Sequence, residues 1–291
     1  MFNLNQSVSS KITLEVIGTD GLVNKSLVFN NIMTNYGLDS WTKGDLGSYL
    51  AIGSGSKEEL ATVTDLAAYV KSSDGVTTSY ATNFIDTPNN VMRSDLILNA
   101  VFPIETAAVN YSEMGIHDNN KDALQTYARL RDGVGAATSV SVQVGEQVRV
   151  TYVVQFSIPL STVSTELIAD VATTITTVPN FSGSSRSVRL PATDKSYIRF
   201  WAAGQAIPKV GISPTGGVVS PRDATVNNGL YKLVVNKTEL NLTGGIALVK
   251  LGDSSSNISI MCHFDPPIPK IATTTMDITC TSTLTNGVFY A

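Results

Sequence analysis

The sequence is poor in residues on which many common functions depend. Its 291 residues include two cysteines, Cys262 and Cys280, which are too few for a disulfide framework. We expect two buried thiols, although both lie in alternating segments and could face one another across strands. Histidine occurs twice, and charged residues make up 15% of the chain. This is below the usual share of about a quarter, so Ser, Thr, Asn and Gly must supply much of the surface.

Long basic and apolar runs are also absent. The net charge is −4 and no segment concentrates Lys and Arg, so the chain lacks the positive stripe that displaces counterions from nucleic acids. No apolar run approaches the roughly 20 residues of a membrane span, and the first residues lack the pattern of a signal peptide. We predict no nucleic-acid partner, no membrane insertion and synthesis in the cytoplasm. Four Asn-x-Ser/Thr triplets are then by-products of composition (Asn24, Asn180, Asn236, Asn257).

The first half of the chain is rich in alternating patterns typical of β-strands. Residues 12, 14 and 16 are apolar between polar neighbours, a Gly18–Gly21 turn follows, and residues 22–30 return as the second strand of a hairpin. Met92–Phe102 predicts another strand. The clearest predicted hairpin joins residues 139–144 to Val148–Phe156 through Gly145–Glu146, a two-residue turn of type II′. Other expected elements are a short helix within 30–41, strands at 48–52, 112–117 and 124–130, and an ambiguous segment at 58–70.

The second half has the same character without a clear helix. Residues 159–187 are rich in Ser and Thr and weakly patterned, which we interpret as a connector with at most one short element. A Pro/Gly-rich loop at Ile207–Pro221 is too long for a simple turn and is expected to be functional or mobile. Predicted strands lie at 197–201, 230–236, 246–251, 257–264 and 276–284.

These patterns predict a mainly β protein with two antiparallel domains that resemble β-sandwiches or jelly rolls. We place an N-terminal domain at residues 1–158, the Ser/Thr-rich connector at 159–187 and a C-terminal sandwich at 188–291.

Two loops resemble ligand-binding motifs but lack their essential residues. I-G-S-G-S (Ile52–Ser56) follows a predicted strand, yet it has no third glycine, no Lys and no following βαβ unit, so we expect a surface turn rather than a nucleotide site. D-N-N-K-D (Asp118–Asp122) starts like a calcium loop. Its sixth position is Ala123 where Gly is needed, and its twelfth is Arg129 where Glu is needed. A looser cation site with His117 is the alternative to a polar hairpin tip.

A zinc cluster and a catalytic triad are both disfavoured by spacing. Cys262, His263, Asp265 and Cys280 offer zinc-ligand chemistry, but adjacent residues of a strand point to opposite faces. A Ser-His-Asp site would have to use His117 or His263, and neither lies in a nucleophile-elbow context. We therefore predict no metal, no cofactor and no catalytic residue.

A glycan-directed site is the remaining alternative. Glu113 is the one carboxylate that we would consider for glycoside cleavage, because it sits in a strand beside the polar loop. Its simpler role is that of a surface or capping carboxylate. Trp41 and Trp201 could form a sugar platform, although aromatics in β-domains more often belong to the core.

The order of short motifs over about residues 1–158 resembles virion proteins of tailed bacteriophages. These motifs are N-x-I-x-T-x-x-G-L-D (30–39), Y-L-x-I-G-S-G (49–55), S-E-M-G-I-H (112–117), Y-A-R-L-R-D (127–132) and V-x-V-x-x-G-E-Q-V-x-V-T-Y (140–152). The resemblance implies a non-enzymatic tail, neck, collar, baseplate or fibre protein that is made in the host cytoplasm and ends in the virion. It also implies a homo-oligomer, trimer or hexamer, with other tail or neck proteins as partners.

A rival hypothesis is an adhesin that binds a host-surface receptor through Ile207–Pro221. A fibrous receptor binder would usually show repeats or coiled-coil heptads, and this chain has neither. The sequence therefore favours a globular structural role over receptor binding or glycan degradation.

Overall fold

The computed structural model describes most of the chain and shows a β protein. It describes residues 2–289 except 43–46, 48, 74–75, 81–83, 119–122, 169, 182–197, 210–213, 215, 228–229, 237–238, 241, 252–257 and 271–274. Strands make up 59% of the chain and helix 3%, in several antiparallel sheets with a β-sandwich-like arrangement. The predicted fold class is confirmed. None of the described helices has the length and hydropathy of a membrane span.

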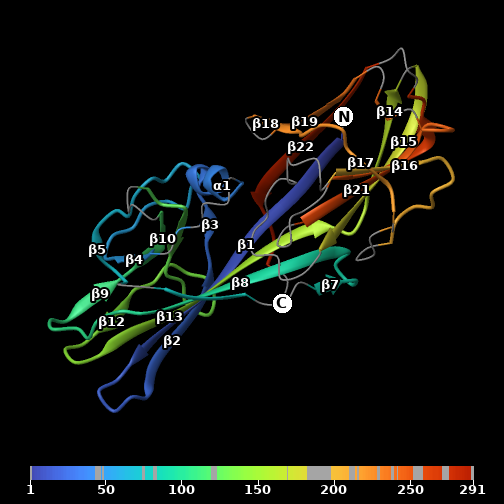
Figure 1. Cartoon of the computed structure of the whole chain (residues 1–291). Coiled ribbons are helices and arrows are strands. Elements are labelled where there is room, and N and C mark those ends of the chain that lie inside the picture. The colour runs from blue at the N-terminus through green and yellow to red at the C-terminus, as the bar shows by residue number, and fades with distance from the viewer. Residues whose placement is uncertain are drawn as a thin grey trace. The chain divides into compact units, whose positions relative to one another are not determined.

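The chain forms two compact units, each assembled from separate segments (Figure 1). Unit 1 consists of Met1–Gln6, Thr82–Ser94 and Ser157–Leu284, and unit 2 of Ser7–Ala81, Asp95–Phe156 and Thr285–Ala291. The division falls within four strands, which contribute residues to both units: β1 (Phe2–Ile17), β8 (Val91–Val101), β13 (Gln147–Pro159) and β22 (Met276–Asn286). The predicted boundaries are contiguous, and the observed units are not.

Unit 2 contains two main sheets. One has the order β2-β1-β13-β8-β6, and the other has the order β3-β11-β10-β4-β5. A two-stranded sheet of β9 and β12 completes the unit. Its further elements are β2 (Val23–Asn30), β3 (Ile32–Met33), α1 (Asn35–Thr42), β4 (Tyr49–Gly53), β5 (Tyr69–Ser72), β6 (Thr77–Tyr80), β9 (Val109–Tyr111), β10 (Glu113–His117), β11 (Thr126–Arg129) and β12 (Val140–Val142).

The core of unit 2 lies between these sheets. The predicted apolar face of β1, formed by Ile12, Leu14 and Val16, is fully buried, as the two-residue period of a strand requires. Tyr152 of β13 donates a hydrogen bond of 2.8 Å to the hydroxyl oxygen of Thr126 on β11, so the two sheets are joined by a buried polar contact as well as by packing. Burying each Leu- or Ile-sized side chain contributes about 1.5–3 kcal/mol.

Helix α1 forms where the sequence predicted a short helix within residues 30–41. Thr34 caps its first turn, because the Thr34 side-chain oxygen accepts a hydrogen bond from the Gly37 N–H at 2.9 Å. Trp41 lies in the last turn, buried, with its ring 5.3 Å from that of Phe156. The helix is thus fixed at both ends to unit 2.

Unit 1 is built around a six-stranded antiparallel sheet of order β14-β15-β21-β20-β16-β17, together with β18-β19-β22 and the β7–β8 pair. Four consecutive residues of β20, Ile246–Val249, are buried, which indicates that both faces of the sheet are covered at this central strand. The elements are β7 (Phe84–Asp86), β14 (Thr162–Ile168), β15 (Val171–Phe181), β16 (Ile198–Ala202), β17 (Val218–Val219), β18 (Thr225–Asn227), β19 (Leu230–Val235), β20 (Ile246–Leu251) and β21 (Ile258–Ile268).

Two local expectations differ from the structure. Residues 159–187 were expected as a connector, yet they hold β14 and β15, which pair over seven residue positions. The reason is that threonine, although polar, is β-branched and fits a pleated sheet. The predicted hairpin at residues 139–156 also differs, because β12 pairs with β9 rather than with β13. Gly145 takes the third position of its turn with φ of +86°, as a type II turn requires.

Candidate functional site

The predicted candidate Glu113 lies at the centre of a buried hydrogen-bonded cluster. Its carboxylate accepts four hydrogen bonds: from the N–H groups of Gly55 at 3.2 Å, Ala67 at 3.0 Å and Ala68 at 2.8 Å, and from the Tyr127 hydroxyl at 3.0 Å. The side chain is fully buried in β10. Because these donors already occupy its oxygens, Glu113 fixes the 54–68 segment to the sheet, which corresponds to the capping role rather than to a surface or acid–base role.

The Glu113 cluster also explains the glycine-rich segment at residues 52–56. The Gly55 N–H donates to the Glu113 carboxylate rather than facing a ligand, and the Gly55 carbonyl accepts a hydrogen bond of 2.6 Å from the Ser112 hydroxyl. The Ser54 N–H is bonded to the Ala68 carbonyl at 2.9 Å. These backbone groups are directed inward, so the segment does not form a phosphate-binding loop.

The protein environment also raises the pKa values of Tyr127, which belongs to this cluster, and of Tyr111 in β9. Burial, which disfavours the charged phenolate, raises the pKa of Tyr127 to about 12. Burial raises the pKa of Tyr111 as well, with a further contribution from the hydrogen bond of 2.5 Å that Tyr111 donates to Glu105. Glu105 in turn forms an ion pair with Lys71. The sequence did not predict this group of Tyr111, Glu105 and Lys71, because Lys71 and Glu105 are 34 positions apart and meet only in the fold.

The polar loop at residues 118–122, for which a cation site was the alternative, is described only at its start. Asp118 is buried and accepts a hydrogen bond of 2.7 Å from the Tyr36 hydroxyl, while residues 119–122 lie outside the described part. His117 is buried in β10, where its ring makes an edge-to-face contact with Tyr69 at 6.4 Å. Within the described chain, no group of three His, Cys, Asp or Glu side chains is placed to hold a metal ion.

The residues of β21 that were weighed as zinc ligands do not converge. Cys262 is buried, and its sulfur lies 3.9 Å from the Thr177 hydroxyl. The adjacent His263 forms a hydrogen bond of 2.9 Å with the Gln205 carbonyl oxygen. The two side chains lie on opposite faces of the strand, as the alternation predicts. The side chain of Cys280 lies outside the described residues, and Asp265 is exposed.

Both tryptophans belong to the core rather than to a sugar platform. Trp41 donates a hydrogen bond of 2.6 Å to the Gln125 side-chain oxygen. Trp201 packs in a cluster with Val178, Leu248 and Met261. Gly217 lies so close to the Trp201 ring that an added Cβ would be 2.5 Å from it, so this part of the predicted loop 207–221 covers the cluster.

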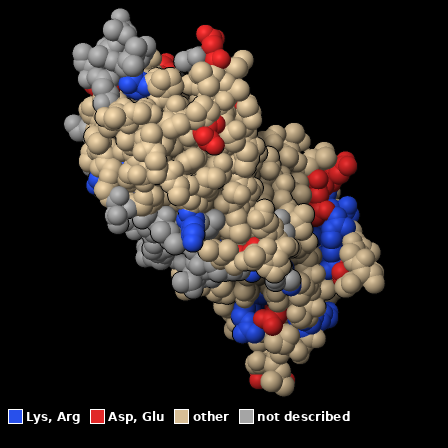
Figure 2. Space-filling model, turned by 90° about the vertical axis from the view of Figure 1, so that its right-hand side faces the viewer, with Lys and Arg blue, Asp and Glu red and all other residues tan. Residues whose placement is uncertain are grey.

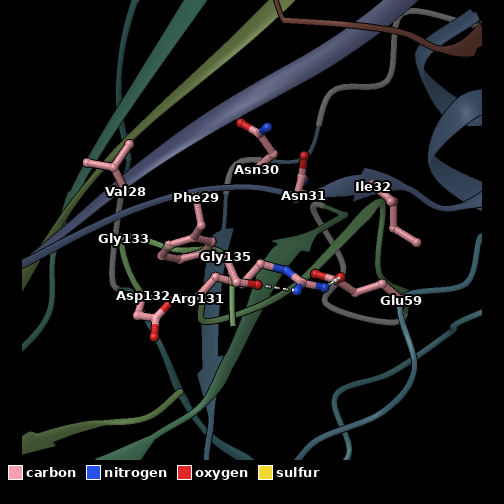
Figure 3. Close-up of a pocket in the computed structure, with 10 residues that line it drawn as sticks. All are labelled: Val28, Phe29, Asn30, Asn31, Ile32, Glu59, Arg131, Asp132, Gly133 and Gly135. Atoms are coloured by element: carbon pink, nitrogen blue, oxygen red, sulfur yellow. Dashed lines mark hydrogen bonds and ion pairs between the residues drawn. The ribbon is translucent and has the colours of Figure 1, made fainter. Parts of the chain in front are cut away.

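A pocket that the sequence did not predict lies between β2–β3 and the 131–137 loop of unit 2 (Figure 3). Its volume is about 420 Å³, and its lining combines aliphatic, aromatic, amide and charged groups: Val28, Phe29, Asn30, Asn31, Ile32, Glu59, Arg131, Asp132, Gly133 and Gly135. Arg131 crosses the pocket wall, donating to the Gly135 carbonyl at 2.7 Å and forming an ion pair with Glu59.

The charged residues of this pocket are held in fixed positions. Glu59 also accepts a hydrogen bond of 3.0 Å from the Arg129 N–H. Asp132 accepts hydrogen bonds from the N–H groups of Val134 at 3.0 Å and Ala136 at 2.9 Å, which fixes the loop. The pocket can therefore accommodate a small polar group without rearrangement of its wall. Two of the sequence motifs, at residues 30–39 and 127–132, contain residues of this pocket.

A second open hollow of about 430 Å³ lies in unit 1 and is lined by Pro221, Arg222, Asp223, Thr225, Lys232 and Val234. Arg222 is bound to Glu239 by two contacts of 2.9 and 3.1 Å. A hydrogen bond from the Asn236 N–H holds the pKa of Glu239 below its usual value.

Comparison of the chain with protein-family models, with curated proteins and with solved structures finds no match.

Proposed function

We propose that the chain is a non-enzymatic structural component of a tailed-phage virion. In this role it assembles as an oligomer at the tail, neck, collar or baseplate, or as a fibre or fibre adaptor. The ordered motifs between residues 30 and 152 support the proposal, since they correspond to strands and turns rather than to a reactive site. Glu113, the strongest catalytic candidate, has its oxygens occupied by structural hydrogen bonds.

The observation that carries the proposal is a surface with little charge and several exposed aliphatic side chains. Figure 2 shows one face on which charged residues form small separate groups among wide areas of other residues. The exposed aliphatic side chains include Leu22, Val134, Val144, Val163 and Leu167. Such a surface loses little hydration energy when it is buried, as subunit contacts require.

Several exposed turns are also held rigidly. The Glu146 carboxylate accepts hydrogen bonds from the Gln143 N–H at 2.8 Å and from the Asn24 side chain at 2.7 Å. The backbone hydrogen bond in particular holds the pKa of Glu146 below its usual value. These contacts join the start of β2 to the turn before β13. Rigid surface turns lose less conformational entropy on association than flexible ones, which favours a permanent assembly.

The test is a reconstruction of intact particles produced by the genome that encodes this chain. We expect the protein in multiple symmetric copies at the tail or neck, and expect particles from a genome with the gene deleted to lack that density. A stable monomer that is absent from purified particles would reject the proposal.

A second candidate function is binding of a host-surface glycan, which the Arg131 pocket supports. Hydroxyl groups of a sugar can bond to amide and carboxylate groups such as those lining this pocket. Under this function, G133W, which adds an indole ring at a residue that lines the pocket, should abolish cell binding by the purified protein. V144W, at an exposed residue outside the pocket, serves as a matched control. Unchanged cell binding by G133W would reject the glycan role for this pocket and leave the structural proposal standing.

A further inference from the structure

Strand β14 is an open edge of the six-stranded sheet in unit 1. It pairs with β15 along residues Thr162–Ile168 without any register shift, and it ends the sheet order on that side. No hydrogen bond joins its other side to any residue that the structure describes. Within the described part of the chain, its outer backbone groups are therefore available to a further strand.

This edge has no Lys, Pro or bulge, three of the features with which proteins prevent pairing. Natural edge strands are usually short, or carry Lys, Pro or a bulge. The opposite edge of the same sheet, β17, has two residues. The longer edge strand of unit 2, β2, contains Lys25. Among the described edge strands of more than four residues, β14 alone has neither Lys nor Pro.

The side chains of β14 are arranged symmetrically about Thr165. Val163, Thr165 and Leu167 share one face, because they lie opposite Thr176, Thr174 and Ala172 of β15. Val163 is 66% exposed and Leu167 is 77% exposed. Exposure of two aliphatic side chains on one face of a short strand is unfavourable in a monomer.

We infer that β14 pairs with β14 of a second copy of this chain, antiparallel and centred on Thr165. In this register Val163 lies opposite Leu167 of the second copy, and the reverse, so that each exposed aliphatic side chain is covered. The two Thr165 residues face one another. The seven residues of the strand overlap completely, and the two sheets become one continuous sheet.

Charge is compatible with this register. Glu166 is the single charged residue of β14, and it lies opposite Ser164 of the second copy rather than opposite the second Glu166. The nearest antiparallel registers that keep the two sheet faces aligned, shifted by two residues, place Val163 or Leu167 opposite Thr165, and larger shifts shorten the overlap of the two strands. They therefore cover less apolar surface, and the Thr165-centred register is favoured.

The β14 contact is one of the contacts between subunits in the assembly that we propose, and it rests on that proposed function only because it requires an oligomer. A contact with two-fold symmetry forms dimers, or hexamers made of three such pairs. A cyclic trimer has no place for it. The β14 contact therefore distinguishes between the oligomers implied by the sequence.

The test compares two charge variants of the full chain by sedimentation velocity over a wide concentration range. V163K/L167K places lysine opposite lysine across the two-fold axis, and should raise the dimer Kd by about tenfold or more. V163K/L167E places lysine opposite glutamate and should restore association. Because both variants replace the same two exposed residues, the second also controls for folding. V218K, at the opposite sheet edge, should leave association unchanged.

A second measurement fixes the register directly. T165C brings two thiols face to face, so a short thiol crosslinker should join two chains, whereas V218C and the wild type should stay largely uncrosslinked. A wild-type protein that is monomeric at all concentrations would overturn the inference. So would equal association of the two charge variants. If the wild type forms an oligomer that neither charge variant disturbs, the β14 contact is rejected while the assembly proposal stands.

Discussion

At the residue scale, the Glu113 cluster is expected to be essential for stability. E113Q replaces one carboxylate oxygen by an NH₂ group, which would face N–H donors that now bond to that carboxylate. Buried donors without a partner cost about 1–3 kcal/mol, so we expect a loss of this size in the free energy of unfolding, measured by urea titration. E58Q, at an exposed carboxylate on the same segment, is the matched control. A loss no larger than that of E58Q would contradict the structural role.

The buried tyrosines predict a loss of stability at alkaline pH. Burial raises the pKa of Tyr127 from 10.0 to about 12, and burial raises the pKa values of Tyr111 and Tyr152 as well. The folded protein therefore holds these protons more tightly than the unfolded chain. The contribution of Tyr127 is fully present below pH 10.0 and is lost as the pH rises to about 12, and the contributions of Tyr111 and Tyr152 also decrease as the pH rises above 10.0.

Urea unfolding at several pH values, followed together with tyrosinate absorbance, measures this loss. Y127F should show a smaller decrease over the alkaline range, because the phenyl ring has no proton to release. Y69F, which alters an exposed tyrosine, should decrease as the wild type does. A free energy of unfolding that stays constant through this pH range would refute the prediction.

At the scale of elements, helix α1 depends on a close approach to the chain before β11. A Cβ added at Gly37 would lie 1.9 Å from the Gln125 carbonyl oxygen, a backbone atom that cannot move away easily. We expect G37A to lower the free energy of unfolding by about 1–3 kcal/mol through overpacking. G133A provides the control, because no atom lies within 4 Å of its added Cβ. Equal stability of the two variants would show that α1 can shift without cost.

Strands could be predicted from the sequence where one face is buried and the other polar. Ile12, Leu14 and Val16 of β1 illustrate this, because alternation alone identifies their buried face. Pairing partners were less predictable. The turn at Gly145 suggested a local hairpin, yet β12 pairs with β9, a strand about 30 positions away in the sequence. The residues of a turn do not indicate whether a strand pairs with its neighbour in sequence or with a more distant strand.

The candidate site was less predictable than the strands. Glu113 could be identified as a carboxylate worth attention, but its donors Gly55, Ala67 and Ala68 are backbone groups, which every residue type supplies. The Arg131–Glu59 pair joins positions 72 residues apart, so no spacing rule connects them. Sequence reasoning identifies side-chain chemistry, whereas burial and hydrogen-bond saturation decide whether that chemistry is available.

At the scale of the whole molecule, the division into two units does not follow the order of the chain. Unit 2 includes the C-terminal residues 285–291, and these residues make defined contacts with its beginning. The Asn286 side chain accepts a hydrogen bond from the Met33 N–H at 2.8 Å and donates one to the Met33 carbonyl at 3.2 Å. The Gly287 N–H donates to the Val8 carbonyl at 2.8 Å. Residues 286 and 287 therefore complete unit 2 through contacts with residues near the start of the chain.

These contacts predict that residues 1–158 do not fold as an independent domain. A fragment ending at position 158 lacks residues 285–291, and its segments 1–6 and 82–94 lose the remainder of unit 1. We expect this fragment to be cleaved faster in limited proteolysis than the same region of the full chain, and to give a poorly dispersed NMR spectrum. N286A in the full chain isolates the terminal contact, and should cost about 1–3 kcal/mol, because Met33 loses both partners. A fragment with a well-dispersed spectrum and protease resistance equal to that of the full chain would instead support the contiguous boundaries that the sequence suggested.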